Sequence, residues 1–192
     1  WQTPNSSFSW QSIIVDSGSN CLPNKVTYVD HYHISQRGDE AFLISNKVKL
    51  GNGPSAINYL TYDYSYSGFS SAHDDGFRID ISNDCGHSWD SIYGAFGADL
   101  ATTSYQSSVW FPTCDSWQTD TINLSSLGYN NDTIMLRFVA INDYGNQFYL
   151  DNININGDNI ISTKNIENYS LRLYPNPSNG SFYVLSIFNN LD

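Results

Sequence analysis

The chain of 192 residues is poor in positive charge. It holds 8 Lys and Arg residues against 19 Asp and Glu residues, a formal net charge of −11. Binding to nucleic acid requires clustered Lys and Arg to neutralise phosphates, and the sequence has no such cluster. The same shortage argues against binding to an anionic membrane surface. The surplus carboxylates suit an extracellular protein and leave oxygen ligands for calcium.

Long apolar runs and helix-favouring residues are also scarce. No run approaches the roughly 18 apolar residues of a membrane span, so we expect no membrane insertion. The chain opens on Trp1 in polar sequence, with no signal peptide, and reads as part of a larger chain. Tyr, Thr, Ser, Asn and Gly are abundant, while Ala, Glu, Lys and Leu are few, which favours strands over helices.

Motifs of catalysis are missing. The sequence contains no His-Glu-x-x-His, no Gly-x-Ser-x-Gly and no glycine loop for phosphate. The paired acids Asp74-Asp75 and Asp39-Glu40 are adjacent, so on a strand they would point to opposite faces. A glycosidase needs two carboxyl groups that face each other across a cleft. We therefore expect a chain that is not an enzyme.

Cysteine is rare and odd in number. The three residues are Cys21, Cys85 and Cys114, which permit three pairings. Cys85 and Cys114 both fall in loops beside aromatic strands. We therefore predict a disulfide between Cys85 and Cys114, with Cys21 free or paired outside this chain.

The clearest local pattern is a hairpin over residues 74–93. Phe77, Ile79 and Ile81 alternate with polar residues, the period of a strand with one buried face. A polar turn with Gly86 follows, and then a second aromatic strand begins at Trp89. Further strands are expected at 26–34, 40–45, 47–50, 56–66, 117–124, 132–141 and 147–156, with an irregular start over 1–24. We conclude that the fold is all-β.

Two strands carry residues with alternative interpretations. His31 and His33 point the same way on the predicted strand 26–34, which suits either a transition-metal site or, as we prefer, a solvated face. Tyr62, Tyr64 and Tyr66 form a row that either lines a sugar-binding face or, as we prefer, packs within the sheet.

The last predicted strand contains a carboxylate on its apolar face. Asp151 alternates in register with Tyr149, Ile153 and Ile155. A carboxylate among buried residues needs a cation or several hydrogen bonds, because its desolvation is otherwise costly. The candidates are Arg137 and a bound calcium ion, of which we favour calcium.

The C-terminal residues resemble a known sorting signal. Tyr174-Pro175-Asn176-Pro177, followed by Gly180 and a strand over 181–184, is similar to the start of the C-terminal sorting domain of type IX secretion in Bacteroidetes. The resemblance implies export by the type IX secretion machinery. We therefore divide the chain into a β-sandwich (1–157), a linker (158–170) and the truncated start of a sorting domain (171–192), a short C-terminal β appendage.

Residues 40–156 resemble a second family. The segments 39–45, 75–82, 84–89, 117–124 and 144–153 are similar to the jelly-roll modules of the choice-of-anchor J and cleaved-adhesin type, which are related to MAM and galactose-binding-like domains. The resemblance implies a jelly-roll β-sandwich that accompanies secreted enzymes. By analogy with jelly rolls, it also implies calcium positions at Asp75 and at Asp151-Asn152.

Three short motifs resemble the O-glycosylation site of Bacteroidetes, Asp-(Ser/Thr)-aliphatic. They place candidate acceptors at Ser91, Thr121 and Thr133. We expect at least one of them to be modified if the chain is exported.

Together these features predict a secreted or cell-surface binding or adhesion module with a glycan or protein ligand. The alternatives are a structural spacer beside a secreted peptidase or glycoside hydrolase, and a subunit of a surface assembly.

Overall fold

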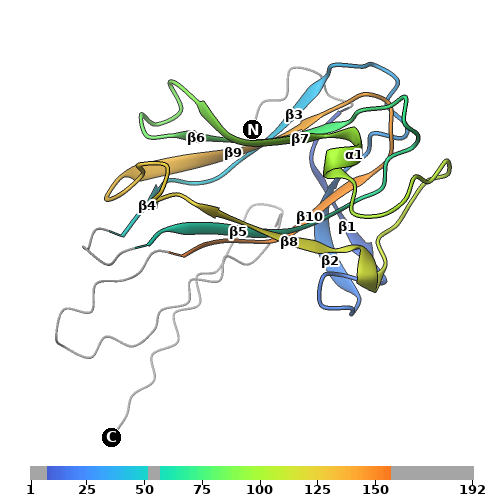
Figure 1. Cartoon of the computed structure of the whole chain (residues 1–192), viewed down its shortest axis with the longest axis horizontal. Helices are drawn as coiled ribbons and strands as arrows, with labels where there is room; N and C mark the ends of the chain where they lie inside the picture. Colours follow the sequence, from blue (N-terminus) through green and yellow to red (C-terminus); the bar gives the residue numbers. More distant parts are fainter. Residues whose placement is uncertain (1–7, 52–56, 157–192) are drawn as a thin grey trace, which may run out of the picture.

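The computed structural model describes residues 8–51 and 57–156 and shows a sandwich of two antiparallel sheets (Figure 1). The first sheet has the order β1-β2-β10-β5-β8, and the second has the order β3-β9-β6-β7, with β4 also pairing with β9. The strands are β1 (Gln11–Val15), β2 (Asn24–Val29), β3 (Glu40–Ile44), β4 (Val48–Lys49), β5 (Tyr59–Tyr66), β6 (Gly76–Ser82), β7 (Asp90–Phe96), β8 (Gln118–Asn123), β9 (Thr133–Ile141) and β10 (Phe148–Asn156). Among the described residues, helical structure is limited to α1 (Gly97–Leu100) and the 3-10 turn Cys114–Ser116. The predicted all-β sandwich is confirmed.

The predicted hairpin is the β6–β7 pair. Its two strands are antiparallel, with a register shift between Ile79 and Asp80, and β6 also pairs with β9 along its whole length. Phe77, Ile79 and Ile81 are fully buried, as their alternation predicts.

Aromatic residues from both sheets fill the core between them. Phe77 of β6 stacks on Phe148 of β10 with ring centroids 4.6 Å apart. Tyr62, Tyr64 and Tyr66 of β5 are at most 3% exposed and face the same core. The packing interpretation of the tyrosine row is therefore confirmed, and these rings are inaccessible to a ligand.

The N-terminal third departs from the prediction in two places. Residues 11–15, expected to be irregular, form β1, which pairs with β2 at the sheet edge. β2 ends at Val29, before the two histidines, so His31 and His33 lie in the following loop and not on one strand face. His31 is only 1% exposed, which corrects the expectation of a solvated side chain.

β10 contains a bulge that changes the environment of Asp151. The pairing of β10 with β5 shifts register between Asp151 and Asn154. Tyr149 and Ile155 therefore lie on different faces of the sheet. Ile155 packs on the main core, whereas Tyr149 packs on the outer side of the first sheet. A bulge re-aims side chains in this way because it adds an unpaired residue to one strand. Arg137, the alternative partner of Asp151, instead donates to Asp80 of β6 at 2.7 Å.

The disulfide joins Cys21 to Cys114, not Cys85 to Cys114 as predicted. Cys114 belongs to the long connection 97–117, which leaves β7, crosses from one sheet to the other and packs Trp110 and Trp117 on the outer side of the first sheet. The Trp117 indole N–H donates to Ser17 O at 3.0 Å, which holds this connection beside the β1–β2 turn and Cys21. Cys85 lies in the β6–β7 turn as an exposed free thiol.

Some expectations fall outside the described residues. These are the linker at 158–170, the appendage at 171–192 and the sorting motif with Tyr174, Pro175, Asn176, Pro177 and Gly180. Within 8–51 and 57–156, no helix is long and apolar enough to cross a membrane.

Candidate functional site

Four connections converge at one end of the sandwich, which we call the loop end. They are the segments 30–39, 67–75, 97–117 and 142–147, and they lie on the right in Figure 1. Their meeting follows from the register, because Val29, Tyr66 and Phe148 are neighbours across one sheet, and Gly76, Phe96 and Ile141 are neighbours across the other.

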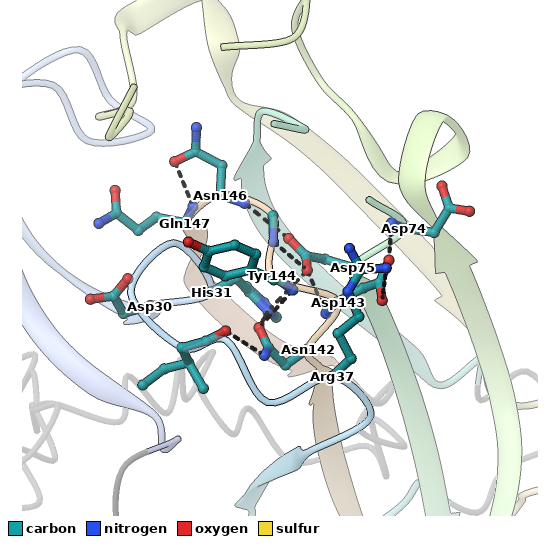
Figure 2. A network of polar contacts seen from close by, with 12 residues as sticks. Asp30, His31, Arg37, Asp74, Asp75, Asn142, Asp143, Tyr144, Asn146 and Gln147 are labelled. Carbon is teal, nitrogen blue, oxygen red and sulfur yellow. Dashed lines mark hydrogen bonds and ion pairs between the residues drawn. The ribbon is translucent and has the colours of Figure 1, made fainter. Parts of the chain in front are cut away.

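The carboxylate of Asp75 organises the loop end (Figure 2). The side chain is 0% exposed. Its Oδ1 accepts hydrogen bonds from the backbone N–H of Asp143 (2.7 Å) and Gly145 (3.1 Å), and its Oδ2 accepts from the N–H of Asn146 (3.0 Å) and the hydroxyl of Tyr66 (2.9 Å). Four donors satisfy a buried charge that would otherwise be costly.

The turn at 142–146 is shaped around this carboxylate. A side chain at position 145 would overlap the Asp75 carboxylate, so only Gly allows the close approach. Tyr144 adopts φ +61°, a left-handed conformation that is unfavourable for a tyrosine. The bonds from Asp75 to both neighbours of Tyr144 keep it in that conformation, and its side chain is 44% exposed.

Asn142 joins this turn to the loop at 30–39. Its Nδ2 donates to Ile34 O (2.8 Å) and Gln36 O (2.7 Å), while its Oδ1 lies 3.1 Å from His31 Nδ1. The imidazole is also 3.5 Å from Asp75 Oδ1. Burial lowers the pKa of His31, and the charge of Asp75 only partly opposes this effect. At neutral pH a neutral imidazole therefore donates its Nδ1 proton within this network.

Asn146 joins the same turn to the connection 97–117. Its Nδ2 donates to Gln106 O (2.8 Å) and Ser108 O (2.9 Å), and its Oδ1 accepts from the N–H of Trp110 (3.1 Å). The turn at 142–146 thus holds three other loops in place, because Asp75 itself ends the segment 67–75.

A row of aromatic side chains lies at the loop end. The rings contact one another in the order His33, Tyr32, Phe69, His73 and Tyr144, and we call them the aromatic row. They come from three different connections, and each is partly or largely exposed. His33 Nδ1 is 2.8 Å from Asp30 Oδ2, and His73 Nδ1 is 2.8 Å from Ser70 Oγ, so hydrogen bonds orient both imidazoles.

Charged side chains flank the aromatic row. Asp30 is next to His33, and Arg37 forms an ion pair with Asp143 (3.4 Å) beside Tyr144. Arg37 is 54% exposed and Asp143 is 27% exposed, so both can reach a ligand. Exposed rings beside polar groups suit the binding of a ligand that has both apolar and hydroxyl surfaces.

The predicted calcium residues are not brought together. Asp75 and Asp151 have no polar partner in common, and both oxygens of Asp75 already face hydrogen-bond donors, an arrangement that does not fit a cation. In the described segments, no group of three or more His, Cys, Asp and Glu side chains is arranged to hold a metal ion.

The oxygens of Asp151 also face hydrogen-bond donors, namely the Asn24 amide and the backbone N–H of Asn152. Asp151 faces Asp63 across the β10–β5 pair, and the amides of Asn24 and Asn152 donate to these two carboxylates. Burial raises the pKa of Asp151, and the charge of Asp63 adds to the effect. The two amides turn their N–H groups, not their oxygens, toward the carboxylates. Calcium binding at Asp151 and Asn152 therefore stays a prediction.

The three candidate glycosylation residues lie on three strands. Ser91 is in β7, Thr121 in β8 and Thr133 in β9, and all three side chains are exposed. Their modification stays a prediction.

Sequence reasoning missed most of the loop-end network. It treated residues 142–146 only as a turn and did not connect His31 with Asp75. The available signal was the cluster of Asn, Asp, Tyr and Gly in that turn, which indicates left-handed backbone and side chain–backbone hydrogen bonds.

Comparisons with known proteins agree on the architecture. No protein-family model matches the chain, and no curated protein matches its sequence. Among solved structures, the K1 cleaved adhesin domain of Lys-gingipain from Porphyromonas gingivalis W83 superposes with a TM-score of 0.54 at 14% identity, covering 78% of this chain and 83% of that domain. The K2 cleaved adhesin domain of Lys-gingipain gives 0.52 at 11% identity, covering 78% and 82%. A family 11 carbohydrate-binding module from Clostridium thermocellum, solved with a mixed-linked tetrasaccharide, gives 0.41 at 16% identity, covering 79% and 84%. The chain therefore has the two-sheet β-sandwich fold of the cleaved adhesin domains.

Proposed function

We propose that this chain is a non-catalytic extracellular module that binds carbohydrate through the aromatic row at its loop end. The observation that carries the proposal is the row itself, five partly exposed rings from three connections that are held in one arrangement by buried hydrogen bonds. Flat rings stack on the C–H faces of sugars, and the flanking charged groups can hydrogen-bond to hydroxyls.

Rigid support favours recognition. A ligand that meets ordered loops does not have to supply the free energy of ordering them. The buried contacts of Asp75 supply that order before any ligand arrives. The solved structures that share this fold are named adhesin domains, and an adhesin is a protein of attachment. A fold alone does not specify a ligand.

The His31–Asp75 pair supports binding more than catalysis. A histidine and a carboxylate in contact occur in many active sites, but catalysis requires access to substrate. Here the two side chains are 1% and 0% exposed, and their hydrogen bonds go to loop backbone and amides. Their role in this proposal is to position the loops.

An extracellular location accords with the Cys21–Cys114 disulfide, because disulfides persist in oxidising compartments. Export by type IX secretion, inferred from the resemblance at Tyr174–Gly180, completes the proposal.

A structural spacer beside a secreted enzyme is the main rival function. A glycan array with the purified chain separates the two. We expect the wild-type chain to bind at least one glycan class, and Tyr144→Ala to weaken binding by about tenfold or more, because it removes an exposed ring of the aromatic row.

The matched control is Tyr129→Ala, which removes a half-buried tyrosine at the opposite end of the sandwich. It should leave binding unchanged. Thermal unfolding of both variants shows whether they remain folded. If the wild-type chain binds no glycan, the spacer function is favoured instead.

A further inference from the structure

The aromatic row is a chain of pairwise ring contacts. Its four successive ring contacts have centroid separations of 5.0, 6.0, 5.1 and 6.1 Å, and each ring touches only its neighbours in the row among the aromatic contacts of these five residues. Even spacing of this kind offers a series of similar contacts instead of one central contact.

Neighbouring rings in the row are steeply inclined to each other. The interplanar angles are 72°, 57°, 79° and 68°. When one ring lies flat against a ligand, the next therefore meets it with its edge.

Both ends of the row are exposed and carry polar partners. At one end the His33 side chain is 60% exposed beside Asp30. At the other end Tyr144 is 44% exposed next to Asp143, which pairs with Arg37 (Figure 2). Both terminal rings are therefore accessible to a ligand from solvent.

The three connections that supply the rings are joined into one body below the surface. Asp75 at the end of the segment 67–75 accepts three backbone N–H groups of the turn that carries Tyr144. Asn142 in that turn binds the loop that carries Tyr32 and His33. The spacing of the rings is therefore preserved across loops that are distant in sequence.

We propose that the ligand is an internal stretch of an extended polysaccharide chain, with successive sugar units lying along the aromatic row, and not a single sugar or a chain end. This inference rests on the proposed carbohydrate-binding function. A site for one terminal sugar surrounds it with convergent groups in a concavity. A row of small, separate contacts binds a single unit weakly and gains affinity with each further unit that it reaches.

The test is a calorimetric titration with cello-, xylo-, manno- and galacto-oligosaccharides, each from disaccharide to hexasaccharide. For the series that binds, we expect affinity to rise by about tenfold or more from disaccharide to pentasaccharide. A tenfold rise in affinity requires only a modest gain in binding free energy, which added ring contacts can supply. Equal affinity for the disaccharide and the hexasaccharide would overturn this inference alone. Binding to none of the oligosaccharides or their polysaccharides would overturn the proposed function as well.

Variants in the two halves of the row, Tyr32 beside His33 and Tyr144 at the other end, sharpen the test. Tyr32→Ala and Tyr144→Ala should each weaken binding of the hexasaccharide. Binding of the disaccharide should be weakened by at most one of the two substitutions. Tyr129→Ala serves as the control for both. If both variants weaken the disaccharide and the hexasaccharide by the same factor, the ligand occupies one compact site and the inference is wrong.

Discussion

The Asp75 carboxylate accepts hydrogen bonds from the backbone on both sides of Tyr144. Oδ1 accepts from the N–H of Asp143 at 2.7 Å and from the N–H of Gly145 at 3.1 Å. An exposed aromatic residue with a positive φ is thus supported by a fully buried charge. This relationship links the stability of the fold to the geometry of the proposed binding surface.

Asp75→Asn should destabilise the protein by about 3 kcal/mol, because an amide replaces one carboxylate oxygen with a donor that faces other donors in a buried site. Urea unfolding followed by tryptophan fluorescence measures the change. The neighbouring Asp74→Asn is the control, since the Asp74 side chain is exposed. Equal urea midpoints for the two variants would show that the Asp75 network does not stabilise the fold.

Stability should fall as the pH drops below about 6.5, where His31 begins to take up a proton in the unfolded chain. Burial lowers the pKa of His31 in the folded state, while Asp75 and Asp30 oppose the shift without reversing it. The unfolded state then binds more protons than the folded state, so acid favours unfolding.

Urea unfolding between pH 7.5 and 5 measures this dependence, and His31→Gln should reduce its slope. His33→Gln is the matched control, because His33 is exposed. An unchanged slope in His31→Gln would exclude His31 as the group responsible.

Cys21→Ser should lower stability by up to about 4.6 kcal/mol, the chain-entropy value for a disulfide that closes a loop of this length. The bond spans 93 residues. Cys85→Ser should leave the unfolding free energy close to that of wild type, since Cys85 is exposed and unpaired. Peptide mapping without reduction should recover Cys21 linked to Cys114, and recovery of a Cys85–Cys114 peptide would restore the pairing first expected.

Calcium should raise the thermal midpoint, and EDTA should lower it, if Asp151 and Asn152 hold an ion as expected. Asp151→Asn should remove this response, because the pair of facing carboxylates with Asp63 is lost. Asp120→Asn in the neighbouring strand β8 is a control acid outside the site. A midpoint that is the same with calcium and EDTA would exclude the site.

The native protein purified from its producing cells should be heavier than its sequence mass if the O-glycosylation motifs are used. Ser91, Thr121 and Thr133 are all accessible on strand surfaces. Thr121→Ala and Thr133→Ala should each remove the mass of any glycan at that position. An unmodified mass would exclude modification at all three residues.

Local sequence pattern was enough to predict the sheets but not their irregularities. The alternation of Phe77, Ile79 and Ile81 anticipated a buried face of β6, because strand side chains alternate with period 2. The same reasoning misplaced Asp151, since a bulge after it breaks the period. Such a bulge depends on the partner strand and leaves no signature in the periodicity of its own strand.

The disulfide shows a second limit. Cys85 and Cys114 are near neighbours in sequence relative to Cys21, yet Cys114 meets Cys21 because its connection crosses the outer side of the first sheet. Loop position and flanking strands contain no information about that path. The packing of Trp110 and Trp117, together with the hydrogen bonds of Asn146 and of Trp117 to Ser17, places that connection.

Composition and short-range pattern by themselves determined that this protein is all-β, because that property depends on side-chain type and on the spacing of a few residues. The tertiary structure alone decided where its loops meet. His31 and Asn142 are 111 residues apart in the chain, and Asp75 lies 70 residues before Gly145, yet they form one network. Hydrogen bonds act over about 3 Å in space, whatever the separation in sequence, so the aromatic row and its support exist only once the strands have brought the four connections together.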